Sequence, residues 1–316
     1  MKILITGVHG FVGSNLVEAL KKEHVIYGLD IVSPMKDGVR FTFSWDYLDK
    51  PNEIPEVDAI IHLAGKAHDT KNQSAADVYF KVNTGLTEKI FDRFLKQPKC
   101  KKFVFFSTAK AAADKVEGIL TEDVIPSPVG PYGESKIAAE RYILEKIQDS
   151  SFKIQDKQVY IFRPCMIHGP GNKGNLNLLY NVVRKGIPWP LGAFENRRTF
   201  TSVENVCFAV NGVLTKDVSS GIYNMGDDEA LSTNELIEEI CKSLGKKAHI
   251  WRLPKGLMNG VAKIGGALHL PLDTERLRKL TENYISSNAK IKAALGVEKM
   301  PVDARTGLQA TLKSFR

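Results

Sequence analysis

A tyrosine and a lysine one helical turn apart are the residues of this sequence best suited to acid–base chemistry. Tyr132 and Lys136 open a segment with helical spacing, and residues at i and i+4 lie on one face of a helix. A free tyrosine has a pKa of about 10 and is a poor base at neutral pH, but a nearby ammonium group favours the phenolate. The pair therefore predicts a tyrosine that accepts a proton and a lysine that lowers its pKa.

Two hydroxyl groups precede this pair, at the end of an apolar strand. Lys102–Phe106 is an almost continuous apolar run, typical of a strand buried on both faces of a parallel sheet, and Ser107 and Thr108 follow it. Ligands bind at the carboxyl ends of the strands in open α/β sheets. The alternatives are that the hydroxyls cap a turn and that the Tyr-x-x-x-Lys spacing arises by chance on a surface helix. The succession of strand, hydroxyls and helix favours a catalytic site.

The elements that would position these groups begin at the start of the chain. Lys2–Thr6 is a short apolar run typical of a buried strand, and a glycine loop follows it. Residues 14–22 carry apolar side chains with helical spacing, and His24–Leu29 is a second apolar strand. A strand, a tight glycine turn, a helix and a parallel strand form the unit that holds the pyrophosphate of a dinucleotide.

The glycine loop and the acid after the second strand predict which dinucleotide binds. Gly7 permits the turn, Gly10 lets backbone N–H groups approach the phosphates, and Gly13 lets the helix pack close to the strand. Asp30 closes the second strand, where a carboxylate accepts hydrogen bonds from the adenosine ribose and repels a 2′-phosphate. We therefore expect NAD rather than NADP. The loop residues expected to bind it are Gly7, Gly10, Phe11, Val12 and Gly13.

The phrase Thr6–Leu16, with glycines spaced Gly-x-x-Gly-x-x-Gly, resembles the extended branch of the short-chain dehydrogenase/reductase superfamily. That branch comprises the NAD-dependent epimerases and dehydratases of nucleotide sugars. His62–Gly65 (HLAG) and the Tyr-x-x-x-Lys segment are similar to further motifs of the family. The resemblance implies that Thr108 hydrogen-bonds the reacting oxygen and that Lys136 also holds the nicotinamide ribose. It places Asp46 at the adenine amino group, although this residue lies in the irregular stretch predicted after Asp30, where an acid in an ordinary turn is an equally good interpretation. It places Asn83, within a long helix predicted over residues 75–95, in support of the sheet. The other residues that it places beside the cofactor are Leu63, Ala64, Gly65 and Ser107.

On the substrate side, the residues between Arg163 and Asn175 (RP…GPG…GN) are also similar to the epimerase branch. Met166 stands where many relatives carry an asparagine, and Asn175 is its nearest replacement. Arg198 matches the arginine that grips the nucleotide diphosphate in the family. The resemblance leaves open whether Arg276 or Arg278 is a second diphosphate ligand. We interpret His168 as a turn residue rather than a catalyst.

The residues after Thr108 reduce the number of reactions that the family resemblance allows. In the family's 4,6-dehydratases an Asp-Glu pair follows the catalytic threonine and eliminates water, but here Ala109, Lys110 and Ala111 follow it. The resemblance therefore implies a nucleotide-sugar 4-epimerase, an isomerase working by oxidation and re-reduction at C4. The alternative is an oxidoreductase, a 4-ketoreductase or dehydrogenase of a nucleotide-linked deoxysugar. A third hypothesis, a non-catalytic NAD sensor or nucleic-acid-binding protein, has no need of the intact acid–base residues.

The size of the chain fits one large α/β core and a smaller lobe, because it has 316 residues, of which 43% are hydrophobic and 25% charged. We predict a Rossmann-type doubly wound parallel sheet that binds NAD over residues 1–168, with 199–226 returning to it. Residues 169–198 and 227–316 are predicted to form the substrate-binding lobe.

The composition of the chain indicates its cellular compartment and the kinds of partner that it binds. The four cysteines are scattered without metal-ligand spacing and no signal peptide opens the chain, so we expect a cytoplasmic protein without a metal. The net charge of +8 comes mostly from scattered lysines without interleaved aromatic residues, which argues against nucleic acid. The apolar stretch 256–272 is too short and too interrupted to span a membrane and predicts a lobe helix. A homodimer is expected.

Overall fold

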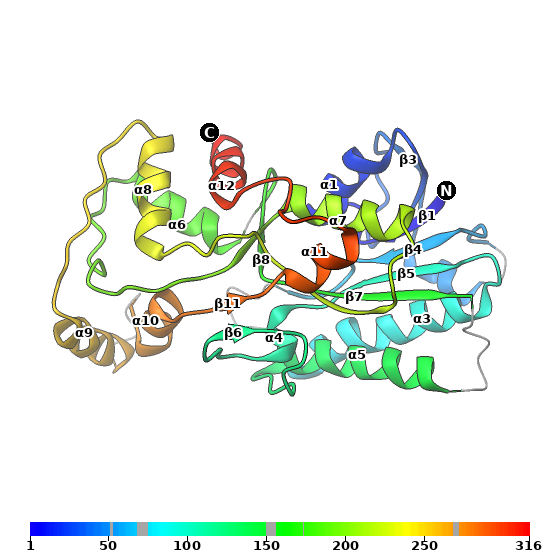
Figure 1. Ribbon diagram of the computed structural model, residues 1–316, viewed down its shortest axis with the longest axis horizontal. Helices are drawn as coiled ribbons and strands as arrows, with labels where there is room; N and C mark the ends of the chain where they lie inside the picture. Colours follow the sequence, from blue (N-terminus) through cyan, green and yellow to red (C-terminus); the bar gives the residue numbers. More distant parts are fainter. Residues whose placement is uncertain (51–52, 68–74, 150–155, 173, 268–271) are drawn as a thin grey trace.

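A seven-stranded parallel sheet forms the centre of the protein, in the strand order β10-β7-β5-β4-β1-β2-β3 (Figure 1). The computed structural model describes residues 1–50, 53–67, 75–149, 156–172, 174–267 and 272–316. The chain runs outward from β1 in both directions, which makes the sheet doubly wound, as predicted. Its strands are β1 (Lys2–Thr6), β2 (Val25–Leu29), β3 (Val39–Phe43), β4 (Ala59–His62), β5 (Lys102–Phe106), β7 (Gln158–Pro164) and β10 (Gly221–Met225).

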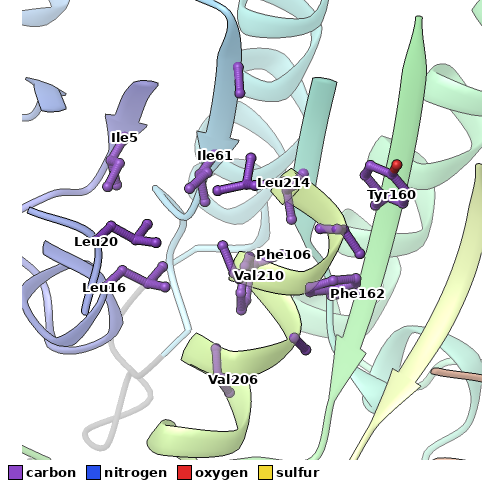
Figure 2. Packing of buried hydrophobic residues seen from close by; sticks show 14 of the residues in the cluster. Ile5, Leu16, Leu20, Ile61, Phe106, Tyr160, Phe162, Val206, Val210 and Leu214 are labelled. Carbon is purple, nitrogen blue, oxygen red and sulfur yellow. The ribbon is translucent and has the colours of Figure 1, made fainter. Parts of the chain in front are cut away.

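Helices cover both faces of the sheet, which is why its central strands are almost continuously apolar. On one face, Ile5, Phe106 and Phe162 of the sheet pack with Leu16 and Val210 from the covering helices (Figure 2). These helices are α1 (Phe11–Leu20), α7 (Val203–Thr215) and α11 (Ala289–Leu295), and those on the other face are α3 (Leu86–Lys96) and α5 (Pro131–Gln148). Because α11 contributes buried residues to the sheet core, the sheet domain includes a segment that the sequence analysis placed in the lobe.

Two segments differ from the sequence prediction. The stretch after Asp30, expected to be irregular, contains β3, which pairs with β2 and buries Thr42 and Phe43 while Phe41 stays exposed. The helix expected over residues 75–95 is divided into α2 (Ala76–Tyr79), a π-helical turn η2 (Phe80–Gly85) and α3. A single π-helical turn inside a helix often marks a functional site.

A second core holds the C-terminal lobe together. The helix α8 begins with a capping box in which the Ser232 hydroxyl accepts from the Glu235 backbone N–H at 3.1 Å. The helix expected over 256–272 is α9, and residues 268–271 lie outside the described residues. Among the described residues, no helix is long and apolar enough to cross a membrane. The lobe helices are α6 (Asn175–Arg184), α8 (Thr233–Ser243), α9 (Lys255–Ala267), α10 (Thr274–Thr281) and α12 (Ala304–Lys313).

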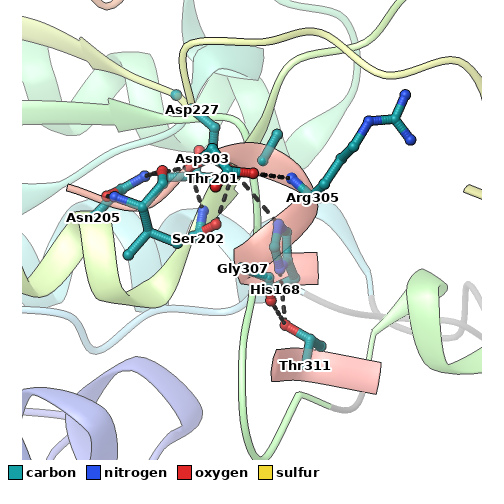
Figure 3. A network of polar contacts seen from close by, with 12 residues as sticks. His168, Thr201, Ser202, Asn205, Asp227, Asp303, Arg305, Gly307 and Thr311 are labelled. Atoms are coloured by element: carbon teal, nitrogen blue, oxygen red, sulfur yellow. Dashed lines mark hydrogen bonds and ion pairs between the residues drawn. The ribbon is translucent and has the colours of Figure 1, made fainter. Parts of the chain in front are cut away.

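A buried polar network joins the lobe to the sheet domain (Figure 3). Asp227 accepts from the hydroxyl of Ser202 at 2.8 Å and from the side-chain amide of Asn205 at 2.7 Å. His168, predicted to be a turn residue, instead ends a short strand and is buried, with Nδ1 2.9 Å from the Thr311 hydroxyl on α12. The turn prediction was wrong because the contact partner on α12 is 143 residues away, so the sequence around His168 does not indicate it. The remaining short elements are β8 (Met166–His168), β9 (Phe200–Ser202), β6 (Ile119–Leu120), β11 (Ile285–Ser286), α4 (Ala109–Ala112) and the 3₁₀ turn η1 (Trp45–Asp49).

Candidate active site

A pocket of about 350 Å³ brings most of the predicted site residues together. It lies where the carboxyl ends of β1, β4, β5 and β7 meet the lobe, the edge of an open α/β sheet at which ligands bind. The predicted residues that line it are Phe11, Val12, Leu63, Gly65, Ser107, Thr108, Tyr132, Lys136, Asn175 and Arg198. One cavity therefore holds cofactor, acid–base and substrate candidates from segments almost 190 positions apart.

The glycine loop has the shape needed to hold a pyrophosphate. Gly7 has a φ of +71°, which side-chain-bearing residues rarely adopt, and a Cβ on Gly13 would overlap the Gly7 carbonyl oxygen and lie 2.9 Å from the Val8 Cα. Gly10 is the N-cap of α1, where no side chain caps the helix and the first turn carries no acid. The N-terminal N–H groups of α1 are thus open to an anion. These residues fit the phosphates of a dinucleotide.

Asp30 is tied to the same loop. Its Oδ2 accepts from the backbone N–H of His9 at 2.9 Å, and its Oδ1 accepts from that of Ile31 at 2.7 Å. Asp30 as a whole is 8% exposed, and these two hydrogen bonds fix its carboxylate next to the glycine loop at the carboxyl end of β2. Asp46 is exposed on η1, just after β3, and Ala64 follows β4 with its N–H donating to Thr6 Oγ1 at 3.1 Å. The cofactor contacts of Asp30, Asp46 and Ala64 stay predictions.

Thr108 and Tyr132 line the same pocket, and their side chains share a hydrogen bond. Thr108 is the N-cap of α4, and Tyr132 lies in the first turn of α5. Burial raises the pKa of the Tyr132 phenol, while a side-chain hydrogen bond with Thr108 lowers it. Burial is the larger effect, so the protein by itself does not favour the phenolate. The lowering expected from Lys136 together with an oxidised nicotinamide stays a prediction.

Lys136 is buried, and its ammonium group has a defined place. Its Nζ donates to the Phe106 carbonyl oxygen at 2.8 Å, and burial lowers its pKa to about 8. A Cβ on Gly65 would lie 3.0 Å from both Lys136 Nζ and Asn83 Oδ1. Gly65 is therefore needed beside the lysine, and its contact with the cofactor stays a prediction.

At the lobe end of the pocket, Arg198 is the arginine that lines the wall. Its Nη1 donates to the Lys279 carbonyl oxygen on α10, and burial lowers its pKa. Arg276 does not line this pocket; its Nε lies 3.6 Å from an Asp273 carboxylate oxygen and its side chain is mostly exposed. Arg278 donates to Glu282 at 2.8 Å and is likewise absent from the wall. The structure thus places neither candidate for a second diphosphate ligand in the pocket.

Further residues of the wall that were not predicted include Lys110, Cys165, Asn172 and Tyr284. Lys110, two residues after Thr108, places its Nζ 4.7 Å from the centre of the Tyr284 ring. Cys165 and Asn172 both lie in the segment between Arg163 and Asn175 that is similar to the epimerase branch, so their positions in the sequence were an available signal. Tyr284 had no such signal, because it reaches the pocket from beyond α10 and is held by donating to the Ala113 carbonyl oxygen at 2.9 Å.

Comparisons with known proteins agree with this geometry. Residues 3–226 match the model of the NAD dependent epimerase/dehydratase family. The chain is 32% identical over 267 residues to a UDP-glucose 4-epimerase of Vibrio cholerae, covering 80% of this chain and 78% of that protein. It is 27% identical over 327 residues to an N-acetyl-α-D-glucosaminyl-diphospho-ditrans,octacis-undecaprenol 4-epimerase of Escherichia coli O157:H7, covering 98% and 94% of the two chains. In fold it is similar to a UDP-glucuronic acid 4-epimerase of Bacillus cereus solved with NAD, with a TM-score of 0.76, 20% identity, and 100% and 98% of the chains covered.

Proposed function

Because the chain belongs to the NAD-dependent epimerase/dehydratase family, we propose that it is a nucleotide-sugar 4-epimerase that uses NAD. One observation carries the proposal: Thr108, Tyr132, Lys136 and Arg198 line a single pocket beside the glycine loop. An acid–base pair, a cofactor loop and a cation for a diphosphate are the groups that the reaction needs in one cavity.

In the proposed mechanism, Tyr132 removes the proton from the 4-hydroxyl of the sugar and returns it after the sugar has turned. NAD held at the glycine loop would supply the hydride acceptor, and then the hydride donor, for C4. Thr108 donates a hydrogen bond to the reacting oxygen, and the Lys136 ammonium favours the tyrosinate by its charge. Arg198 binds the diphosphate with charge-assisted hydrogen bonds, so that the sugar can turn while the nucleotide stays in place.

Because no acid–base pair follows Thr108, this site is not suited to a dehydration reaction. Ala109 and Ala111 are buried, and Lys110 is a cation that donates to the backbone and carboxylate oxygens of Asp114 at 2.7 and 3.1 Å. A cation held in this way offers no base for the elimination of water. The proposal is therefore confined to hydride transfer at C4.

The test is incubation of the enzyme with UDP-hexoses, N-acetylated forms included, and catalytic NAD without a reductant. We expect the C4 epimer to accumulate to equilibrium with no net change in nicotinamide absorbance, because each hydride is returned. If no epimer forms, and a nucleotide-linked 4-keto-6-deoxy sugar is reduced with stoichiometric consumption of NADH or NADPH, the protein is the 4-ketoreductase instead.

We further propose a cytoplasmic homodimer whose partner is a nucleotide sugar and not nucleic acid. The four cysteines are free thiols, which suits a reducing compartment. Light scattering coupled to gel filtration measures the mass against 35.1 kDa for one chain. A monomeric mass, or a shift of labelled DNA or RNA at physiological salt, would contradict these assignments.

A further inference from the structure

A buried ion pair lies behind the site, one helical turn beyond Lys136. The side chains of Glu140 on α5 and Arg163 on β7 are 0% and 2% exposed, and Nη2 of the arginine lies 2.5 Å from Oε2 of the carboxylate. Arg163 Nε also lies 3.0 and 3.1 Å from the two carboxylate oxygens. Such a pair costs desolvation and is weak support for stability by itself, so its position suggests another role.

The pair connects three segments that carry site residues. Glu140 follows Lys136 at i+4 and lies on the same face of α5. The Ser107 hydroxyl, next to Thr108 at the end of β5, donates to the Glu140 carboxylate. Arg163 lies at the end of β7 that leads into the pocket. The carboxylate is thus fixed by donors from two strands.

Few charges face the Lys136 ammonium. Burial lowers its pKa to about 8, and the charge of Glu140 acts in the opposite direction and raises it. From β4, His62 faces it as a neutral ring, because burial and the charge of Lys136 lower the His62 pKa to about 3. Among the described residues, Tyr132 on α5 lines the same pocket as Lys136, and Arg163 on β7 is engaged by the Glu140 carboxylate. Glu140 is the acid that favours a protonated Lys136.

We propose that Glu140 is a positioning residue that keeps the Lys136 ammonium charged beside Tyr132, while Arg163 and Ser107 hold its carboxylate in place. The proposal rests on the proposed function, in which Tyr132 and Lys136 form the acid–base pair. When the site loses one proton, that proton leaves either the phenol or the ammonium. Negative charge at Glu140, nearer to the lysine, favours the state with tyrosinate and ammonium.

The substitution Glu140→Gln tests this directly in the NAD-loaded enzyme. Lys136 should lose its proton at lower pH, so the alkaline limb of the kcat profile should move down by roughly 1 pH unit. The plateau value of kcat should fall as well, because a smaller fraction of Tyr132 is present as tyrosinate. The ultraviolet absorbance of tyrosinate, taken as the difference from Tyr132→Phe, measures that loss without turnover.

Three further variants control for structural damage. Glu239→Gln makes the same change in a lobe ion pair, where Arg305 Nη1 lies 3.0 Å from Glu239 Oε1, and should leave the limbs in place. Glu140→Asp keeps the negative charge, so the alkaline limb of its kcat profile should lie at the wild-type pH. If Glu140→Gln does not fold, Glu140→Gln combined with Arg163→Met removes both buried charges at similar volume and should shift the alkaline limb in the same direction.

A Glu140→Gln profile lowered at every pH, with unmoved limbs and wild-type tyrosinate absorbance, would overturn the proposal and leave the pair a purely structural role. An equal shift in Glu239→Gln would overturn it too. If the wild-type protein turned over no nucleotide sugar, the proposed function would fail, but the tyrosinate measurement would still decide the role of Glu140.

Discussion

The side-chain amide of Asn83 donates to the hydroxyl of Ser135 at 2.9 Å and thereby ties the π-helical turn to the helix that carries Tyr132 and Lys136. The same side chain accepts from the Lys66 backbone N–H at 2.7 Å and so reaches the loop after β4. Asn83 is fully buried in the π-helical turn, a feature that is frequent at functional sites. Asn83 thus fixes the cofactor side of the pocket relative to the acid–base side.

Asp30 should select NAD over NADP, because its fixed carboxylate would meet a 2′-phosphate with like charge. The wild-type protein is expected to bind NAD more tightly, and Asp30→Asn should reduce the preference by roughly tenfold, equivalent to about 1.4 kcal/mol. Calorimetric titration of both cofactors measures it. The control is Asp58→Asn, because Asp58 does not line the pocket. In the wild type the Asp58 carboxylate accepts from the Lys2 backbone N–H at 2.6 Å. Equal or tighter NADP binding by the wild type would disprove the assignment.

Tyr132→Phe should keep NAD binding and lose turnover by about 100-fold or more, because the general acid–base group is removed. Tyr142→Phe is the matched control on the same helix, since its hydroxyl donates to Asp92 Oδ1 at 2.6 Å and does not line the pocket. Steady-state rates on the identified substrate measure both. Wild-type turnover in Tyr132→Phe would show that another group is the base.

Arg198→Ala should weaken the binding of UDP or a UDP-sugar by roughly 1.5–3 kcal/mol, the value of a hydrogen bond to a charged group, and leave NAD binding intact. Its neighbour Arg197 is the control, because the Arg197 guanidinium lies 3.2 Å from Glu235 on the exposed side. Calorimetric titration with UDP compares the two alanine variants. An unchanged dissociation constant for Arg198→Ala would remove this arginine from the diphosphate site.

Gly65→Ala should damage activity more than stability. The added Cβ would press on the flexible end of Lys136, so we expect the fold to survive and kcat to fall on the order of tenfold or more. Gly260→Ala on α9 is the opposite case, because its Cβ would meet nothing within 4 Å. That variant should raise the unfolding free energy by about 0.5–1 kcal/mol and keep its activity. Urea unfolding and kcat distinguish the two, and equal kcat values would contradict the expectation.

His62 should make the protein sensitive to acid. Burial lowers its folded pKa from 6.5 to about 3, and its two ring nitrogens lie 2.7 and 2.9 Å from the hydroxyls of Thr6 and Thr87. The unfolded chain binds the proton more readily, so stability is full above pH 6.5 and falls as pH drops toward 3, by at most about 1.4 kcal/mol per unit. His62→Gln should flatten this slope in urea unfolding followed against pH. A slope equal to that of the wild type would assign the acid sensitivity to other groups.

The sequence by itself determined the sheet and the residues at its edge. Lys2–Thr6 and Lys102–Phe106 are short apolar runs typical of a strand buried on both faces, and both form strands as predicted. The glycine loop and the i, i+4 pair of Tyr132 and Lys136 are local features whose geometry follows from backbone sterics. Because parallel strands end at one edge, their order along the chain already placed these residues together.

Only the tertiary structure decided what the lobe contributes. Tyr284 reaches the pocket and Arg276 does not, although neither has a local pattern that distinguishes it. In the sequence, Glu140 is one of several charged residues on a predicted helix. Only the tertiary structure places Arg163, 23 residues away, against it. The physical reason is that burial and charge pairing depend on which distant segments pack together, whereas strand and helix formation depends on neighbours along the chain.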